Sequence, residues 1–220
     1  MEIFPVGASI CVILAIVIAI WVHRGKKRTE ALQAVASSLI FSFSKKADKS
    51  FVKMNSLDQF HLFSRGHSRK VLNVMTGRSK DIEVMIMDYW FTTGGGNNSR
   101  RWGQTITLFQ CSRLRLPSFV VRPENIFHRV GSVFGYKDID IDSHPIFSKQ
   151  YLLRGVDEEA VRKLFAGELL KYYDDHKGLS TEGDGDRLIF YRSSRRVPPD
   201  GIQSFLEEGH EIVRLYMTEV

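Results

Sequence analysis

The chain has 220 residues, of which 43% are hydrophobic and 25% charged, with 17 glycines and 6 prolines. This length suits one domain with an appendage, and the composition excludes collagen-like and wholly disordered proteins. The net charge of +6 is uneven, because residues 1–80 carry 13 Lys/Arg against 4 Asp/Glu, whereas residues 81–220 carry 18 against 21. Two cysteines are too few to staple a secreted scaffold, and both Cys11 and Cys111 are interpreted as small buried hydrophobic residues.

An uncharged apolar segment covers residues 3–22. As a helix it would be about 30 Å long, which matches the hydrocarbon core of a bilayer. A cleaved signal peptide would need a basic segment ahead of a shorter apolar stretch, but Glu2 is the only charged side chain before this segment. A helix buried in a protein would keep a polar side, and this segment has none. We therefore predict an uncleaved transmembrane helix in the lipid bilayer.

Basic residues directly after this segment predict its orientation, because Lys and Arg close to a span stay on the cytoplasmic side. They are Arg24, Lys26, Lys27 and Arg28. We expect residues 1–28 to be a single-pass anchor in the cell (inner) membrane, with the amino terminus outside. Its basic flank is a candidate contact for anionic lipid. Residues 29–220 are expected to form one soluble cytoplasmic domain.

An amphipathic helix is predicted over residues 29–40, nearly continuous with the anchor, because its apolar residues recur at helical spacing. These residues are Leu32, Val35, Ala36, Leu39 and Ile40. The lysine-rich stretch at 45–53 predicts a loop.

Strand patterns dominate the middle of the chain. Residues 69–76 and 81–91 have hairpin spacing around a turn at 77–79. The second of these strands is apolar on both faces, which predicts a central strand covered on both sides. Further strands are predicted at 104–112, 118–122, 147–154 and 187–193.

Helices are predicted mainly later in the chain. They cover 123–134, a segment that begins at the N-cap Asp157 and ends before Gly178, and a closing segment from Pro199. The glycine-rich residues 182–186 are interpreted as a turn. Because the strands come early as a meander, we predict an α+β fold with a mainly antiparallel sheet and packed helices.

Several short stretches between Leu114 and Phe165 form a distinctive set: 116–120, 122–124, 138–142, 144–148, 151–155 and 161–165. In these stretches the chain resembles a family of uncharacterised, mostly bacterial proteins with a membrane helix or two and one soluble domain of unknown function. The similarity extends over about residues 30–215. It implies a bacterial inner-membrane location and supplies no catalytic residues.

The sharpest polar pattern is Asp138, Asp140, Asp142 and His144, which would share one face of an extended strand. Three carboxylates and an imidazole could recruit a hard cation, and this run is the only candidate metal site. An EF-hand loop is excluded, because its sixth and twelfth positions would be Ser143 and Lys149. The alternative is a structural strand or turn whose acids pair with nearby arginines.

A glycine-rich loop is predicted at 92–103, with Arg100, Arg101 and Trp102 at its tip. These residues could enter a lipid interface or bind an acidic partner. The alternative is an ordinary loop whose Trp102 folds back on the sheet.

The sequence contains no G-x-G-x-x-G, P-loop or G-x-S-x-G motif, and its histidines show no metal-binding spacing. Nucleic acid is not expected as a partner, because the chain is net acidic after residue 80. We predict no cofactor and no catalytic residue. The expected function is a membrane-anchored binding or regulatory module for a protein partner or the membrane surface. The alternative is a metal-dependent enzyme that uses the run from Asp138 to His144.

Overall fold

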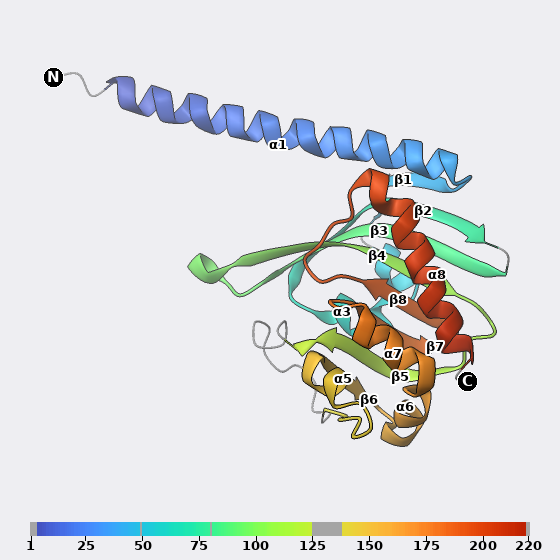
Figure 1. Cartoon of the computed structure of the whole chain (residues 1–220). Coiled ribbons are helices and arrows are strands. Elements are labelled where there is room, and N and C mark those ends of the chain that lie inside the picture. Colours follow the sequence, from blue (N-terminus) through green and yellow to red (C-terminus); the bar gives the residue numbers. More distant parts are fainter. Residues whose placement is uncertain (1–3, 49, 80, 125–137, 219–220) are drawn as a thin grey trace.

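In the computed structural model, the described residues are 4–48, 50–79, 81–124 and 138–218, with the backbone alone described for 4–11. An antiparallel sheet runs through the molecule, and helices pack on both of its faces (Figure 1). The predicted α+β class and the mainly antiparallel sheet are confirmed.

The sheet has eight strands in the order β1-β2-β3-β4-β8-β7-β5-β6, and every pairing is antiparallel. The strands are β1 Ser42–Lys46, β2 His67–Ser79, β3 Ile82–Thr93, β4 Arg100–Gln110, β5 Leu116–Pro123, β6 Tyr151–Gly155, β7 Ser180–Gly185 and β8 Arg187–Tyr191. The first four form a meander, and the chain then returns to build the other end.

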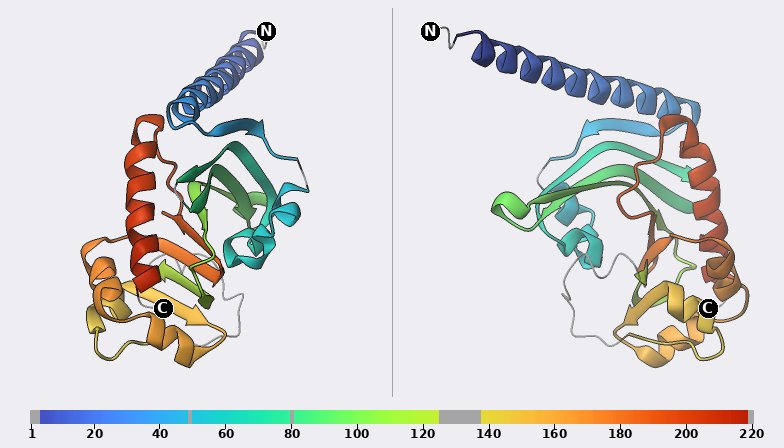
Figure 2. Two further views of the ribbon diagram at one scale, coloured as in Figure 1. Left: turned by 90° about the vertical axis from the view of Figure 1, so that its right-hand side faces the viewer. Right: turned by 60° about the vertical axis from the view of Figure 1, so that its left-hand side comes forward.

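The helices divide between the two faces (Figure 2). Short segments cover one face: α2 Phe51–Met54, the 3-10 turn η1 Leu57–Gln59 and α3 His61–Ser64. The other face carries α5 Pro145–Gln150, α6 Glu158–Leu164, α7 Gly167–Asp175 and α8 Ile202–Thr218, while α1 Phe4–Ser38 packs by its carboxyl end along β1 and β2. Two further 3-10 turns are η2 Gly96–Asn98 and η3 Pro199–Gly201.

Two apolar cores result from this arrangement. The core under α8 contains the Ile202, Phe205 and Tyr216 side chains and extends to Leu32 and Ala36 of α1. The core under α3 contains Phe63 among other aromatic and aliphatic side chains. The middle of the sheet is therefore covered on both faces, and β3, β4 and β8 contribute side chains to both cores.

The predicted amphipathic helix at 29–40 is confirmed as the carboxyl half of α1, which ends at Ser38. Leu32 and Ala36 are fully buried, whereas Ile40, with φ of 58°, lies outside the helix and is 93% exposed. No break separates this half from the residues before it. The helix therefore joins the apolar segment and the domain as one continuous element.

The predicted central strand is confirmed as β3, which lies between β2 and β4 and carries the fully buried Ile86. Its hairpin with β2 turns between Ser79 and Ile82, so the turn predicted at 77–79 is wrong. Gly77 lies inside β2, where a Cβ atom would come within 2.1 Å of the Phe41 ring. Its glycine reflects close packing, not a turn.

Several predicted boundaries are wrong. The loop at 45–53 overlaps β1 and α2, the strand at 147–154 is α5 followed by β6, and the turn at 182–186 is largely β7. The helix after Asp157 is two helices, because the chain breaks before Gly167, whose φ is +48°. Residues 125–134 of the predicted helix 123–134 lie outside the described residues, and Pro123 ends β5.

Candidate functional site where the amino-terminal helix meets the sheet

Arg28 ties α1 to the sheet through a buried ion pair with Asp88 of β3. Its Nε and Nη2 atoms each donate to one carboxylate oxygen at 2.8 Å, and Nη1 donates to the Val197 carbonyl at 2.9 Å. The two side chains are only 13% and 2% exposed. A bidentate pair fixes direction as well as distance, so the axis of α1 is set relative to the domain.

Both carboxylate oxygens of Asp88 accept hydrogen bonds from protein side chains. Its carboxylate also accepts from Asn73 Nδ2 and Thr105 Oγ1, both at 2.9 Å, and Asn73 Oδ1 accepts from Thr29 of α1. Asn73 sits in a bulge of β2 with φ of 52°, which turns its side chain toward Asp88. The network therefore connects α1 with three successive strands.

A ladder of tryptophans and arginines continues from this network toward the amino end of α1. The Arg101 guanidinium carbon lies 4.3 Å from the centre of the Trp90 ring and 5.9 Å from that of Trp21 in α1. Arg196 stacks on Trp90 at 4.8 Å. Gly103 faces Trp90 across the strands, and a Cβ there would come within 2.3 Å of the indole. The absence of that side chain is what lets Trp90 lie flat.

Arg196 also interacts electrostatically with Arg28, Asp88 and Arg101 at this junction. Burial, and then the charge of Arg28, lower the pKa of Arg196, while Asp88 opposes the shift. The junction of α1 and the sheet is therefore a positively charged, aromatic surface.

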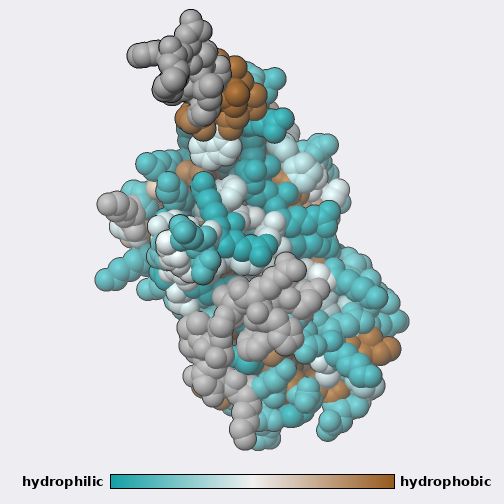
Figure 3. Space-filling view, turned by 90° about the vertical axis from the view of Figure 1, so that its left-hand side faces the viewer, coloured by the Kyte–Doolittle hydropathy of each residue, from teal (hydrophilic) through white to brown (hydrophobic). Residues whose placement is uncertain are grey.

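Beyond the junction, α1 projects from the domain, and its described apolar side chains there are uncovered (Figure 1). The large hydrophobic side chains from Val12 to Val22 are 47% to 65% exposed, on all sides of the helix. Figure 3 shows hydrophobic side chains gathered on this projecting end, above a mostly hydrophilic face of the domain. The hairpin of β3 and β4 projects in the same direction as the helix (Figure 2).

The predicted span at 3–22 falls partly outside the described part of the chain. Within the described part, no helix is both long and apolar enough to cross a membrane. The predicted lipid-binding flank needs one correction. Arg24, Lys26 and Lys27 are exposed, but Arg28 is committed to Asp88 and faces the protein, because a buried carboxylate lies within reach of its guanidinium.

The acidic run is not the extended strand that its alternation predicted. Residues 138–144 form a loop, held because the Ile139 amide donates to the Leu153 carbonyl and the two isoleucines are buried. Asp138 Oδ1 accepts from the Leu153 amide at 3.1 Å, and its pKa is raised by partial burial.

The remaining members of the acidic run are not gathered into a site. Asp140 and Asp142 are exposed, and the His144 ring bonds its neighbour Ser143. In the described residues, no group of three His, Cys, Asp or Glu side chains is placed to hold a metal ion. The run closes a loop against β6.

The predicted tip at 100–102 is also placed differently. Arg100 already begins β4, and the connection with β3 is residues 94–99. Trp102 is 6% exposed and donates its Nε1 hydrogen to Thr93 Oγ1 at 2.8 Å, with Arg100 stacked 4.2 Å over its ring. The alternative in which Trp102 folds back on the sheet is correct, and Arg101 is the cation left facing α1.

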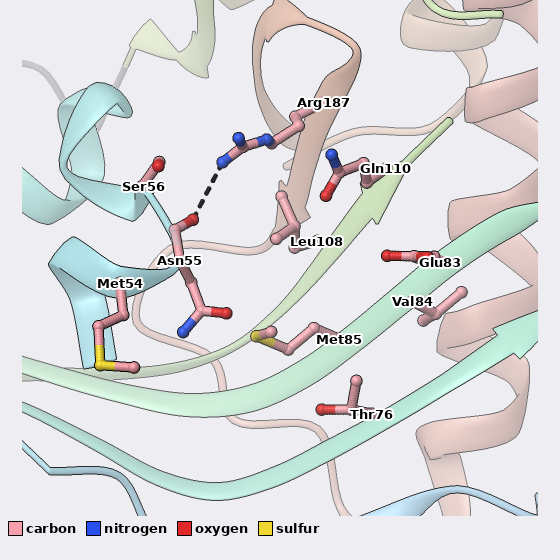
Figure 4. Close-up of a pocket in the computed structure, with 10 residues that line it drawn as sticks. All are labelled: Met54, Asn55, Ser56, Thr76, Glu83, Val84, Met85, Leu108, Gln110 and Arg187. Carbon is pink, nitrogen blue, oxygen red and sulfur yellow. Dashed lines mark hydrogen bonds between the residues drawn. The ribbon is translucent and has the colours of Figure 1, made fainter. Parts of the chain in front are cut away.

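Two pockets lie away from the junction. One of about 280 Å³ lies between β3, β4 and the segment 54–56, where Arg187 Nη1 donates to the Asn55 carbonyl at 3.0 Å (Figure 4). Its lining is mixed, with Met54, Met85 and Glu83 around it, and offers no group of catalytic residues. The other, of about 830 Å³, has a basic lining that includes Lys149, Lys177, Arg192 and Arg195. Arg192 is held by Glu208.

Comparisons with known proteins identify a likeness of fold. No protein-family model and no curated protein matches the chain. The chain is similar to the crystal structure of the mycobacterial trehalose monomycolate transport factor A, TtfA, with a TM-score of 0.59 and 10% sequence identity. The alignment covers 87% of this chain and 93% of that one. At this identity the likeness shows a shared fold.

Proposed function

We propose that this chain is a membrane-anchored accessory protein without catalytic activity, whose sheet domain is fixed to the bilayer by α1 and binds a protein partner at its surface. The observation that carries the proposal is the construction of α1. From Val12 to Val22 this helix is apolar and exposed, and its carboxyl half is locked into the domain through Arg28 and Asp88. Because α1 is fixed rigidly to the domain, its insertion would set the orientation of the whole domain relative to the bilayer.

The exposed half of α1 needs an apolar environment. Burying apolar surface contributes roughly 25 cal/mol per Å². A continuous exposed apolar surface, such as that from Val12 to Val22, marks a site of contact with a membrane or another protein. Residues 3–22 together are long enough to cross a bilayer. Arg24, Lys26 and Lys27 directly follow and would hold the domain on the cytoplasmic side.

The junction would then lie among the lipid headgroups. Trp21 lies near the end of the apolar segment, and indoles prefer the membrane interface. Because Arg101 stacks between Trp21 and Trp90, the end of the β3–β4 hairpin would reach the same depth. A cation near an anionic surface contributes about 1 kcal/mol, so Arg101 would add to the three basic residues of the flank.

The fold neighbour supports an accessory role. It is named as a transport factor, and a supporting task of this kind fits the proposal. We place the protein in a bacterial inner membrane on the sequence resemblance given above.

A cysteine at Ser204 tests the topology. This residue is exposed on α8, far from α1 in sequence and clear of the core. In intact cells, the Ser204→Cys chain should resist a membrane-impermeant maleimide and should react after lysis, because the domain faces the cytoplasm.

The unsubstituted chain controls for the native cysteines, of which Cys111 is buried. Equal labelling of the Ser204→Cys chain before and after lysis would overturn the proposed orientation.

A further inference from the structure

A buried charged cluster lies at the end of the sheet opposite α1, on the face covered by α3. Glu182 of β7 is 1% exposed; its Oε2 accepts from the Leu62 amide at 3.0 Å and its Oε1 from the Tyr191 hydroxyl at 2.9 Å. In the register of β5, β6 and β7, Val120 is paired with both Arg154 and Glu182. Their side chains, and that of Arg122 two residues further along β5, therefore share one face of the sheet.

Cations outnumber carboxylates in this cluster. Arg65, which follows α3, is 4% exposed, and Arg122 is 8% exposed. Both act electrostatically on Glu182, and Arg154 interacts electrostatically with Asp138, which lies outside the cluster. Residues 125–137 carry no Asp or Glu, so this segment supplies no countercharge either.

Within the described residues, the hydrogen bonding of the Arg65 and Arg122 guanidinium groups is incomplete. In the described part of the chain neither side chain donates a hydrogen bond, and the Nε atom of each is buried without a partner. The Arg65 guanidinium carbon lies 5.2 Å from the centre of the Phe91 ring. Each guanidinium carries five N–H donors, and a buried donor without an acceptor is destabilising. Two such groups beside one carboxylate form an incomplete site.

The ionisation of the cluster points the same way. Burial, and then the charges of Arg122, Arg65 and Arg154, lower the pKa of His61 to about 3, so this imidazole is neutral at physiological pH. Burial raises the pKa of Glu182, although Arg122 opposes the shift. A protonated Glu182 would increase the excess of positive charge.

We propose that Arg65 and Arg122, beside Glu182 of β7, form a binding site for an oxyanion, specifically a phosphate group. The planar forks of two guanidinium groups match the oxygens of a phosphate, and the negative charge would balance the excess of the cluster. Arg154 and Val120 on the same face are only half-buried, so solvent reaches this edge of the sheet. The phosphate group belongs to a free phosphate or phosphoester, or to the headgroup of a phospholipid.

Thermal unfolding of the full chain in a non-ionic detergent tests this site. Inorganic phosphate should raise the melting temperature at constant ionic strength, because a ligand that binds only the folded state stabilises it. Arg122→Gln and Arg65→Gln should lose this increase. Arg115→Gln, an exposed arginine ahead of the same part of β5, should retain it. An equal loss in Arg115→Gln would mean a general salt effect and would overturn the proposal.

Glu182→Gln keeps the test decisive if the arginine variants fail to fold. Removing the Glu182 carboxylate should tighten phosphate binding by about tenfold or more. The reason is that its repulsion of a phosphate in a partly buried site is larger than the free energy of a tenfold change in affinity. A purely structural role predicts destabilisation of Glu182→Gln with no change in its phosphate response. A melting temperature independent of phosphate in both the native chain and Glu182→Gln would overturn the proposal.

A second ligand distinguishes a lipid headgroup from a free phosphate as the source of the phosphate group. Short-chain phosphatidic acid is compared with diacylglycerol of the same chain length and with inorganic phosphate. A response to phosphatidic acid well above that to phosphate assigns the site to a lipid headgroup, and an equal response assigns it to a free phosphate. Either result supports the site, and neither depends on where α1 is inserted.

Discussion

At the scale of single residues, the junction depends on the pair of Arg28 and Asp88. A buried ion pair contributes little net stability, because desolvation offsets the attraction, but its geometry selects one arrangement of the chain. Here every oxygen of Asp88 is bonded and Arg28 uses three nitrogens, one of them toward the Val197 carbonyl. The pair therefore defines how α1 leaves the domain. The sequence alone assigned Arg28 to the lipid-facing flank, since its partner is 60 residues away.

Asp88→Asn should destabilise the domain by about 3–5 kcal/mol, because it leaves the Arg28 charge buried without a counterion. Adding Arg28→Met to this variant should recover part of the loss. Glu83→Gln on the same strand, whose pair with Arg78 spans 3.9 Å at the surface, should change stability by less than about 0.5 kcal/mol. The measurement is unfolding by denaturant, and an Asp88→Asn effect as small as that of Glu83→Gln would refute the role of the pair.

At the scale of elements, the spacing of apolar residues predicted the helices and strands that have regular buried faces. The apolar residues of α8 and of the second half of α1 repeat every three or four positions, and β3 is apolar on both faces, so each was recognisable. Strand β7 was missed because its composition is that of a turn. Gly183 is required there by packing, since a Cβ would lie 2.3 Å from the Phe119 ring. Such contacts between distant segments leave no local pattern.

The candidate sites were less predictable than the elements, for the same reason. Asp88, Trp90 and Arg101 become a site only when α1 crosses the sheet, and Glu182 meets Arg65 only through the fold. The acidic run, in contrast, was conspicuous in sequence but forms a loop supported by Ile139 and Ile141. Charge patterns along a chain do not report which charges become buried.

Two helical glycines provide a paired prediction. Gly209 of α8 packs on the sheet, and a Cβ there would lie 2.6 Å from the Phe109 ring, whereas a Cβ at Gly25 of α1 would meet nothing within 4 Å. Gly209→Ala should therefore destabilise the domain by about 1–3 kcal/mol through overpacking. Gly25→Ala should stabilise the helix by about 0.5–1 kcal/mol, because alanine loses less backbone entropy. Unfolding free energies measure both, and a stabilising Gly209→Ala would contradict the close contact of α8 with the sheet.

At the scale of the whole molecule, the two ends of the sheet carry different features. The strands β1 to β4 meet α1, and their hairpin follows the direction of the projecting helix (Figure 2). The strands β5 to β7 carry the buried arginine cluster at the other end. We propose that the domain is held at the membrane by one end of its sheet and carries a phosphate site at the other end.

Extraction of membranes at high pH tests the central claim, that α1 anchors the domain in a bilayer. The native chain should remain in the membrane pellet. Leu14→Arg with Val17→Arg should move it to the supernatant, because each charge near the middle of a span costs about 2.5–3.5 kcal/mol. Both side chains are exposed, so the domain should stay folded, and Leu14→Met with Val17→Leu serves as the matched control. A native chain released at high pH as completely as the arginine variant would contradict the anchor.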